Sequence, residues 1–274
     1  MSSEPKTIII DTGNIFKFGI IQRKGLNDVN VEVLEGIASV LDSYSNRMAK
    51  WDTIELNGKD VKCLRLNGEG NNSFENHDRS KLKLTVKLFL YADAEQSDEY
   101  KQQLASESIN ALVKLLNLNQ IDNLILSVQT DDMDQVLTEL ESFWTFYETF
   151  VLNEKIRQLG TSDLNFTQLS DLYGWAKRIK PSSTQINLNT CCDIPADLSA
   201  FAKENSIQLL THNDPVDNFI PIESLQKLFK TKDVSCSLLT DNQTLKRKWI
   251  ARYTFVLPGQ GVVLTKGYML SLLV

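Results

Sequence analysis

The runs LTVKLFLY at Leu84–Tyr91 and IDNLILSV at Ile121–Val128 decide the fold class. Both have the length and composition of β-strands, and the second is apolar enough to be buried on both faces. Between them, the segment Glu99–Leu118 places leucine, isoleucine and valine at spacings close to a helical stripe. A strand, an amphipathic helix and a second buried strand in this order predict a βαβ unit with parallel strands.

The same alternation continues after this unit. The segment Asp132–Phe150 carries aliphatic and aromatic residues every three or four positions, which predicts the strongest helix in the chain, and core packing is the simplest role for its aromatic stripe. Further elements are then predicted in order: strands at Ile156–Leu164, Gln185–Leu188 and Ile207–Leu210, and helices at Phe166–Ile179 and after Asp193 and Pro195. Four or five consecutive βα units leave few fold classes open.

The pattern is weaker towards both ends of the sequence. Here it predicts strands at Thr7–Ile10 and Val61–Leu66 around a helix at Val31–Trp51, then a helix at Thr244–Val256 and a strand at Gly261–Thr265. About eight strands, mostly followed by helices, fit a (β/α)8 TIM barrel better than an open doubly wound sheet. We expect an irregular N-terminal part, and a truncation after the last strand that leaves the closing helix missing or reduced to Gly267–Val274.

Length and charge limit the number of domains and the class of partner. A chain of 274 residues could form two average domains or one barrel of about 250 residues. We favour a single domain over residues 1–274, with a flexible loop at about 68–80. Because the formal net charge is −6, no electrostatic field would draw the chain to nucleic acid or to anionic lipid. Neither is an expected partner.

Cysteine usage indicates a reducing compartment. Four cysteines in a chain of this length are too few for a disulfide scaffold, and Cys63, Cys191, Cys192 and Cys236 form no CxxC pair. The N-terminus does not resemble a signal peptide, and no apolar stretch approaches the roughly 20 residues that span a bilayer. We therefore expect a cytoplasmic protein. Cys191 and Cys192 follow a predicted strand, either as packing groups or as an exposed thiol that pairs with a partner or responds to oxidants.

Few motifs of catalytic chemistry are present. The sequence has no P-loop, and two histidines without HExxH or paired cysteines offer little to a metal ion. His77 lies in a polar run and is interpreted as a solvated surface residue. His212, two residues before Asp214, stands at the end of a predicted buried strand, where barrel proteins place functional groups. The two residues form either a local hydrogen-bonded turn or an acid/base pair.

Several strand ends carry a family resemblance. Leu82–Leu90, Leu159–Leu164, Gln185–Asn187 and Ile250–Tyr253 followed by Gly261–Lys266 resemble successive landmarks of the aldo-keto reductase barrel, in that family's order. Within the superfamily, the stretch Leu159–Pro215 resembles the regulatory (modifier) subunits of glutamate-cysteine ligase. The resemblance continues through Trp249, Arg252, Tyr253, Lys266 and Tyr268. It implies a barrel of the aldo-keto reductase type.

The reductase chemistry that this resemblance implies is largely missing. Such an enzyme needs a Tyr general acid tuned by Lys and Asp, a His beside the carbonyl, and polar groups that hold the nicotinamide amide. Lys87 falls where the family has its catalytic Lys, but Ser127 stands in place of the His, and the Asp-x4-Tyr motif is absent. Asp163 and Leu188 replace the Asn and Gln that hold the cofactor. We therefore expect no catalytic residue, no cofactor and no metal, and a vestigial Lys87 kept because a buried amine with a carboxylate partner stabilises the barrel.

The resemblance instead implies a binding role. The expected partner is the catalytic subunit of glutamate-cysteine ligase, in a 1:1 heterodimer in which this chain improves the apparent affinity for glutamate and relieves feedback inhibition by glutathione. The expected docking surface includes Cys191, Cys192, His212 and Asp214, together with the segment Trp249–Tyr268. Two alternatives stay open: an NADPH-dependent carbonyl reductase with an unusual site, and a sensor that binds a dinucleotide through Lys87 and Lys266.

Overall fold

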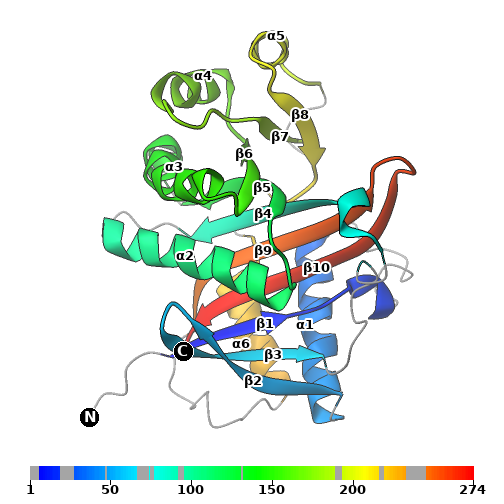
Figure 1. The fold of residues 1–274 in the computed structure, drawn as a ribbon. Coiled ribbons are helices and arrows are strands. Elements are labelled where there is room, and N and C mark those ends of the chain that lie inside the picture. Colours follow the sequence, from blue (N-terminus) through cyan, green and yellow to red (C-terminus); the bar gives the residue numbers. More distant parts are fainter. Residues whose placement is uncertain are drawn as a thin grey trace. The chain divides into compact units, whose positions relative to one another are not determined.

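The computed structural model divides the chain into two compact units (Figure 1). Unit 1 comprises Met1–Lys83 with Asn218–Val274, and unit 2 comprises Leu84–Asp217. The structure describes residues 6–18, 28–46, 48–66, 74, 77–91, 96–130, 132–188, 193–215, 219–232 and 245–274. Within these ranges, no helix is both long and apolar enough to cross a membrane.

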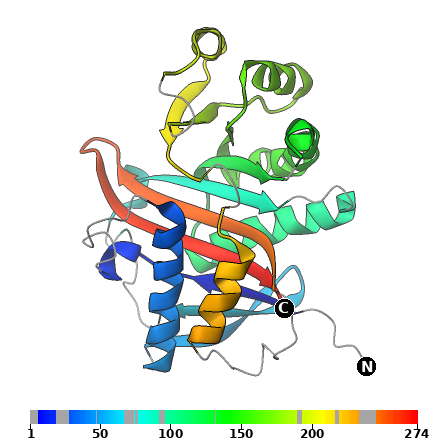
Figure 2. The same cartoon turned by 180° about the vertical axis from the view of Figure 1, so that it is seen from behind.

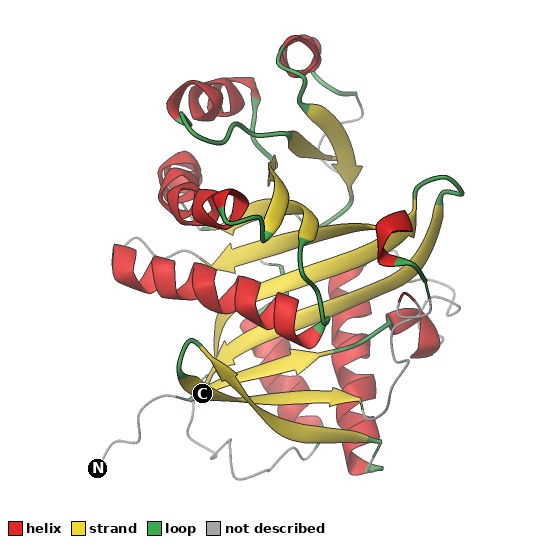
Figure 3. Cartoon of the chain, in the orientation of Figure 1, coloured by secondary structure: helices red, strands yellow, loops and turns green. Residues whose placement is uncertain are grey.

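Unit 2 is a parallel α/β unit whose strands pair in chain order. Its strands are β4 (Lys83–Tyr91), β5 (Ile121–Gln129), β6 (Ile156–Ser162), β7 (Ser183–Asn187) and β8 (Gln208–His212). Its helices are α2 (Asp98–Leu115), α3 (Val136–Leu152), α4 (Phe166–Trp175) and α5 (Ala196–Glu204), with the short 3-10 helix η5 (Met133–Gln135) before α3. Helices and strands alternate along the chain, as Figure 3 shows.

Local sequence explains where these helices begin. The Ser97 side chain accepts the backbone N–H of Tyr100 and caps α2. Asn165 and Gln168 form a reciprocal capping box at the start of α4. Because parallel strands place their carboxyl ends at one edge of the sheet, the residues that follow β6, β7 and β8 are brought to the same edge. This edge, which we call the carboxyl edge of unit 2, carries the candidate site.

Unit 1 is a mixed sheet with two helices on one side. Its strands lie in the order β2 (Ala49–Leu56), β3 (Lys59–Leu66), β1 (Thr7–Asp11), β10 (Val262–Leu273) and β9 (Lys246–Leu257). Only the β1–β3 pair is parallel among the pairings described within this unit. Helices α1 (Val29–Ser45) and α6 (Ile222–Thr231) lie side by side against the sheet (Figure 2), with the 3-10 helices η1 (Ile15–Phe18) and η4 (Arg79–Lys81) in its connections.

The predicted α/β class is confirmed, and so is the run of βα units in the middle of the chain. The antiparallel pairing of β2 with β3 agrees with the irregular N-terminal part. The single domain over residues 1–274 stays a prediction. The predicted flexible loop at 68–80 lies largely outside the described residues, which include only Phe74 and residues 77–80 of it.

Two predictions near the ends were wrong. Thr244–Val256 is not a helix, because most of it is strand β9. Of the two alternatives for the closing helix, a reduced helix at Gly267–Val274 is excluded, because β10 runs to Leu273. The helix predicted to reach Trp51 ends at Ser45, and β2 begins at Ala49. Both errors concern aromatic and β-branched residues that pair in antiparallel hairpins, so tertiary pairing decided against an apparent helical spacing.

Candidate functional site

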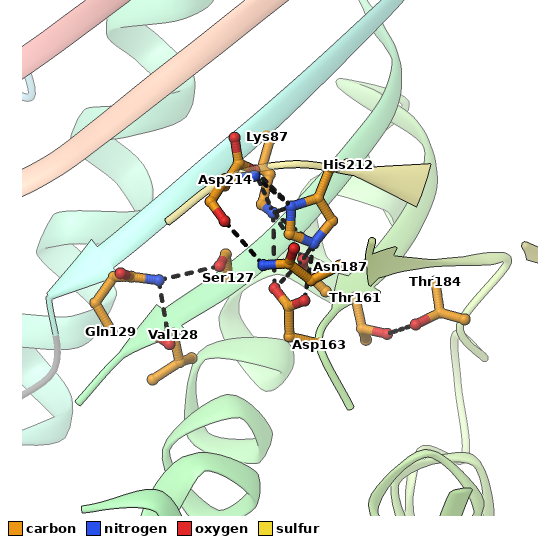
Figure 4. A network of polar contacts seen from close by, with 11 residues as sticks. Lys87, Ser127, Val128, Gln129, Thr161, Asp163, Thr184, Asn187, His212 and Asp214 are labelled. Atoms are coloured by element: carbon orange, nitrogen blue, oxygen red, sulfur yellow. Dashed lines mark hydrogen bonds and ion pairs between the residues drawn. The ribbon is translucent and has the colours of Figure 1, made fainter. Parts of the chain in front are cut away.

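A buried lysine is the centre of the carboxyl edge of unit 2. Lys87 lies on β4 with its side chain 2% exposed, and its Nζ donates to Oδ2 of Asp214 over 2.8 Å and to Oγ of Ser162 over 2.7 Å (Figure 4). Oδ2 of Asp163 lies 3.8 Å from the same Nζ. We call Lys87, Ser162, Asp163, His212 and Asp214 the Lys87 cluster. The expected buried amine with a carboxylate partner is present, and the partner is Asp214.

His212 lies between the two carboxylates of the cluster. Its Nε2 is 2.8 Å from Oδ1 of Asp163, and its Nδ1 is 3.0 Å from Oδ2 of Asp214. Burial by itself would lower the pKa of His212, but the contacts with Asp163 and Asp214 outweigh burial and raise that pKa above its ordinary value of 6.5. Conversely, burial would raise the pKa of Asp163, but the bond from His212 and the charge of Lys87 hold it below its ordinary value. The predicted pairing of His212 with Asp214 is therefore part of a larger ionic cluster.

The backbone fixes Asp163 in an uncommon conformation. Its φ of 65° is in the left-handed region, which Asp and Asn tolerate better than most residues. The Asp163 N–H donates to the Gln185 carbonyl over 2.9 Å, and Ser162 Oγ donates to Oδ2 of Asp163 over 2.6 Å. The Asp163 side chain is 42% exposed, whereas the side chains of Lys87, His212 and Asp214 are each at most 3% exposed. Asp163 is therefore the solvent-facing member of these charged groups.

Neighbouring strands extend the network. Asn187, the last residue of β7, donates from Nδ2 to the Asp214 carbonyl over 2.8 Å, and the Leu188 N–H donates to the His212 carbonyl over 2.9 Å. Ser127 on β5 is buried, and its Oγ accepts a hydrogen bond from Nε2 of Gln129 at 3.1 Å. The cluster thus joins the middle of β4 to the ends of β6, β7 and β8.

The other predicted residues lie in unit 1 and form a separate set of contacts. Tyr253 donates from its hydroxyl to Oδ1 of Asp11 over 2.8 Å, and burial raises the pKa of Asp11. Lys266 Nζ lies 2.6 Å from Oε1 of Glu32, the oxygen that also accepts the Tyr268 hydroxyl. Lys266, through which the sensor alternative would bind a dinucleotide, is therefore already paired with a carboxylate.

The expected docking residues of unit 1 are mostly buried. Trp249, Tyr253 and Tyr268 are fully buried, and Arg252 on β9 is partly exposed. A partner could not touch the three aromatic side chains in this conformation. Their role in docking stays a prediction. If they contribute, they must do so by supporting the exposed residues around them.

The predicted thiol site cannot be placed. Cys191, Cys192 and Cys236 lie outside the described residues. Next to the vicinal cysteines, Leu188 and Ile194 are exposed apolar residues. Cys63 on β3 is a free thiol that is fully buried, and burial raises its pKa far above its ordinary value, so it is not a reactive thiolate. In the described part of the chain, no group of three or more His, Cys, Asp or Glu could hold a metal ion.

The family assignment follows from a match over more than half of the chain. Residues 60–216 match the model of the aldo/keto reductase family. The chain belongs to the aldo/keto reductase family. This stretch includes all of unit 2 except its last residue, and hence the whole Lys87 cluster.

Relatives that match nearly the whole of this aldo/keto reductase family member are named as regulatory subunits of a ligase. It is 29% identical over 269 residues to the "Glutamate--cysteine ligase regulatory subunit" of Mus musculus, with 97% of this chain and 92% of that one covered. The Homo sapiens protein of the same name is 29% identical over 270 residues with the same coverage. The chain is thus homologous to glutamate-cysteine ligase regulatory subunits over nearly its full length.

Solved aldo/keto reductases resemble parts of the chain. One from a Medee basin deep-sea metagenome library has a TM-score of 0.35 and 24% identity, covering 46% of this chain and 41% of that one. Another, from Klebsiella pneumoniae in complex with NADP and acetate, has a TM-score of 0.30 and 17% identity, covering 38% and 35%. Similarities at this level carry no functional argument.

The donor set of the Lys87 cluster does not fit the nicotinamide cofactor that aldo/keto reductases imply. Where the family has an amide, Asp163 presents a carboxylate that already binds His212 and Ser162. Leu188, in place of the second amide, is apolar and 45% exposed. The Lys87 ammonium is paired with Asp214. A carboxamide placed here would lose its donors and meet an ion pair that is already satisfied.

Sequence reasoning located part of this site. Lys87, His212 and Asp214 were predicted at strand ends, and Asp163 was noted only as a departure from the family. The roles of Ser162, Asn187, Asp11 and Glu32 were missed. Asp163 directly follows Ser162 in the run Gly160–Leu164, so an acidic residue beside a hydroxyl at a strand end was the available signal for Ser162. Nothing in the sequence singles out Asp11 or Glu32.

Proposed function

We propose that this chain is a non-catalytic regulatory subunit that binds the catalytic subunit of glutamate-cysteine ligase in the cytoplasm as a 1:1 heterodimer. The observation that carries the proposal is the homology to glutamate-cysteine ligase regulatory subunits over 97% of the chain. Because that homology spans both units, a role of the whole chain is proposed, rather than a role of the reductase-like part alone.

The chemistry of the Lys87 cluster supports a non-catalytic role. A reductase of this family uses a lysine and an Asp to tune a tyrosine acid, and the Asp-x4-Tyr motif is absent from this sequence. In this chain the carboxylate that lies 2.8 Å from Lys87 Nζ belongs to Asp214, after β8, and both side chains are excluded from solvent. Lys87 thus has a carboxylate partner without the motif that supplies the tyrosine acid.

The proposed effect on the catalytic subunit is allosteric. Association improves the apparent affinity for glutamate and relieves feedback inhibition by glutathione, because binding favours a substrate-competent state over an inhibited one. Coupling of this kind is usually worth about 1 to 3 kcal/mol, which is about 5- to 150-fold in affinity.

The test is reconstitution with the catalytic subunit from the same organism. Sedimentation should give a 1:1 complex, and initial rates should show a lower half-saturating glutamate concentration and weaker inhibition by glutathione than the catalytic subunit alone. An unchanged glutamate response in a complex that forms would refute the allosteric effect. No complex at micromolar concentrations would refute the partner.

A second candidate function has one observation in its favour, the family match over residues 60–216. It is an NADPH-dependent reductase, or a sensor that binds the dinucleotide through Lys87 and Lys266. Fluorescence titration of the purified chain with NADPH, followed by turnover of simple aldehydes, separates the candidates. Saturable binding with turnover favours the reductase. Binding without turnover that Lys266→Ala abolishes favours the sensor, and the absence of binding excludes both.

A further inference from the structure

Nδ1 of the His212 ring faces both a hydrogen-bond donor and a hydrogen-bond acceptor of Asp214. The Asp214 N–H donates to Nδ1 over 3.1 Å, and Oδ2 of Asp214 lies 3.0 Å from the same Nδ1. A neutral ring accepts the backbone N–H there, whereas a protonated ring donates to the carboxylate. In both states Nε2 donates to Asp163 over 2.8 Å. The ring can therefore gain or lose a proton at Nδ1 without a change of position.

The charge of the cluster depends on this one proton. The charged groups that face the ring are Lys87 from β4, Asp163 after β6 and Asp214 after β8. The nearest groups from β6 and β7, Ser162 and Asn187, are neutral. With a neutral ring, one ammonium stands against two carboxylates and the cluster is an anion. With a protonated ring, the charges balance.

Only one of these charged groups is exposed enough for a partner to sense the change in charge. Lys87, His212 and Asp214 have side chains at most 3% exposed, and Asp163 is 42% exposed. The bonds of Asp163 to Gln185, Ser162 and His212 hold its carboxylate at the carboxyl edge. A fixed, half-exposed carboxylate with an incomplete countercharge matches a guanidinium or ammonium group.

We propose that His212 is a protonation switch for the carboxyl edge of unit 2: the neutral ring leaves Asp163 as an anionic contact for a basic side chain of a protein partner, and the protonated ring neutralises that contact. The inference rests on the proposed function, which supplies the partner, the catalytic subunit of glutamate-cysteine ligase. Since two carboxylates flank the ring, they raise the pKa of His212, and the change from protonated to neutral occurs above its ordinary value of 6.5.

The switch itself can be tested on the isolated full-length chain. The chain has two histidines, so histidine labelled with 13C at Cε1 gives two signals, and the exposed His77 is an internal reference. The His212 signal should titrate above the ordinary histidine pKa of 6.5. Asp163→Asn, which removes one flanking carboxylate, should lower the His212 midpoint, and Asp171→Asn, an exposed residue of α4, should not. A His212 midpoint at or below 6.5, or one that Asp163→Asn leaves unchanged, would overturn the switch.

The docking contact is tested on the complex. Affinity for the catalytic subunit is measured at low ionic strength at two pH values, one below and one above the His212 midpoint found in the titration. It should rise about two- to fivefold with pH for the unmodified chain, the usual worth of one exposed ion pair. Asp163→Asn should lose this gain, and Asp171→Asn should keep it. A complex whose pH dependence Asp163→Asn leaves intact overturns the docking contact and leaves the proposed function standing. Failure to form any complex refutes both the docking contact and the proposed function, while the histidine titration still tests the protonation switch.

Discussion

Lys87 and Asp214 form an ion pair from which solvent is almost fully excluded. Two buried charges are costly to desolvate, so such a pair persists only where hydrogen bonds satisfy the remaining polar atoms. Here Ser162 accepts from Lys87, and the Asp214 carbonyl accepts from Asn187. The pair therefore links β4 to the ends of β6, β7 and β8, and it leaves the Lys87 amine engaged in an ion pair.

Removal of one charge of this pair should be strongly destabilising. Lys87→Met leaves the Asp214 carboxylate buried without its cation, and the free energy of unfolding in urea should fall by about 3 to 5 kcal/mol. The double variant Lys87→Met, Asp214→Leu removes both charges and should recover much of the loss. A double variant no more stable than the single one would show that packing, and not charge, causes the effect.

His212 makes the stability of the fold dependent on pH. Because its pKa in the folded chain is raised above 6.5, the protonated ring stabilises the fold. This contribution is complete below about pH 6.5, where the unfolded chain is also protonated, and is lost as pH rises through the folded pKa. In urea unfolding at several pH values, the stability difference between the unmodified chain and His212→Gln should shrink from pH 6 to pH 9. A difference that grows over this range contradicts the raised pKa.

At this scale the sequence predicts which residues stand at strand ends, but not which of them touch. Lys87 and Asp214 are 127 positions apart, and their contact follows from the pairing of the strands between them. Position at the end of a predicted strand therefore identified His212 and Asp214, and the family resemblance identified Lys87. The bond that Lys87 donates to Ser162 depends on the register of β4, β5 and β6.

Among the elements, the β9–β10 hairpin departs most from the sequence-based expectation. The segment Lys246–Leu257 has buried residues at Trp249, Ala251, Tyr253 and Phe255, the alternation of a strand. Ile250 is buried as well, and this second buried face gave the sequence an apparent helical spacing. The central strands of unit 2 were predictable because each is a short apolar run bounded by turns, and neither β9 nor β10 has that form.

The close contact of this hairpin with the segment after β1 requires a glycine. A Cβ on Gly267 would lie 2.3 Å from the Gly13 carbonyl oxygen and 2.3 Å from the Tyr253 hydroxyl, so Gly267→Ala should lower the free energy of unfolding by about 1 to 3 kcal/mol. Gly259→Ala in the turn is the matched control, because its Cβ would meet nothing within 4 Å. Thermal or urea unfolding of the two variants compares them directly, and equal stabilities would contradict the steric explanation.

For the whole molecule, the two units differ in how the chain builds them. Unit 2 is one continuous segment, whereas unit 1 combines a segment before unit 2 with one after it. A pattern of local alternation can describe the first arrangement and not the second, since the partners of β1 include β10, more than 250 positions away. The sequence therefore predicted unit 2 in detail, whereas in unit 1 it predicted β1, α1 and β3 but not the β9–β10 hairpin.

The pairing of β1 with β10 predicts a shared opening of the two strands. Their register runs from Thr7 with Leu273 to Asp11 with Met269, so the two strands protect each other's amides. In native-state hydrogen exchange, these amides should report one opening free energy, separate from that of β5 in unit 2. Exchange of β10 well before β1 would show that the pair does not open as a unit.

The pairing of β1 with β10 also matters during synthesis of the chain on the ribosome. β1 is synthesised before any of unit 2, and β10 after all of it. At about 5 to 20 residues per second, β1 waits about 10 to 50 seconds for that partner. In this interval β1 can pair with β3, but the edge of its apolar run Ile8–Ile10 that later binds β10 is open. An open apolar edge is a site for aggregation, so the nascent chain is exposed to aggregation through β1 until β10 has been synthesised.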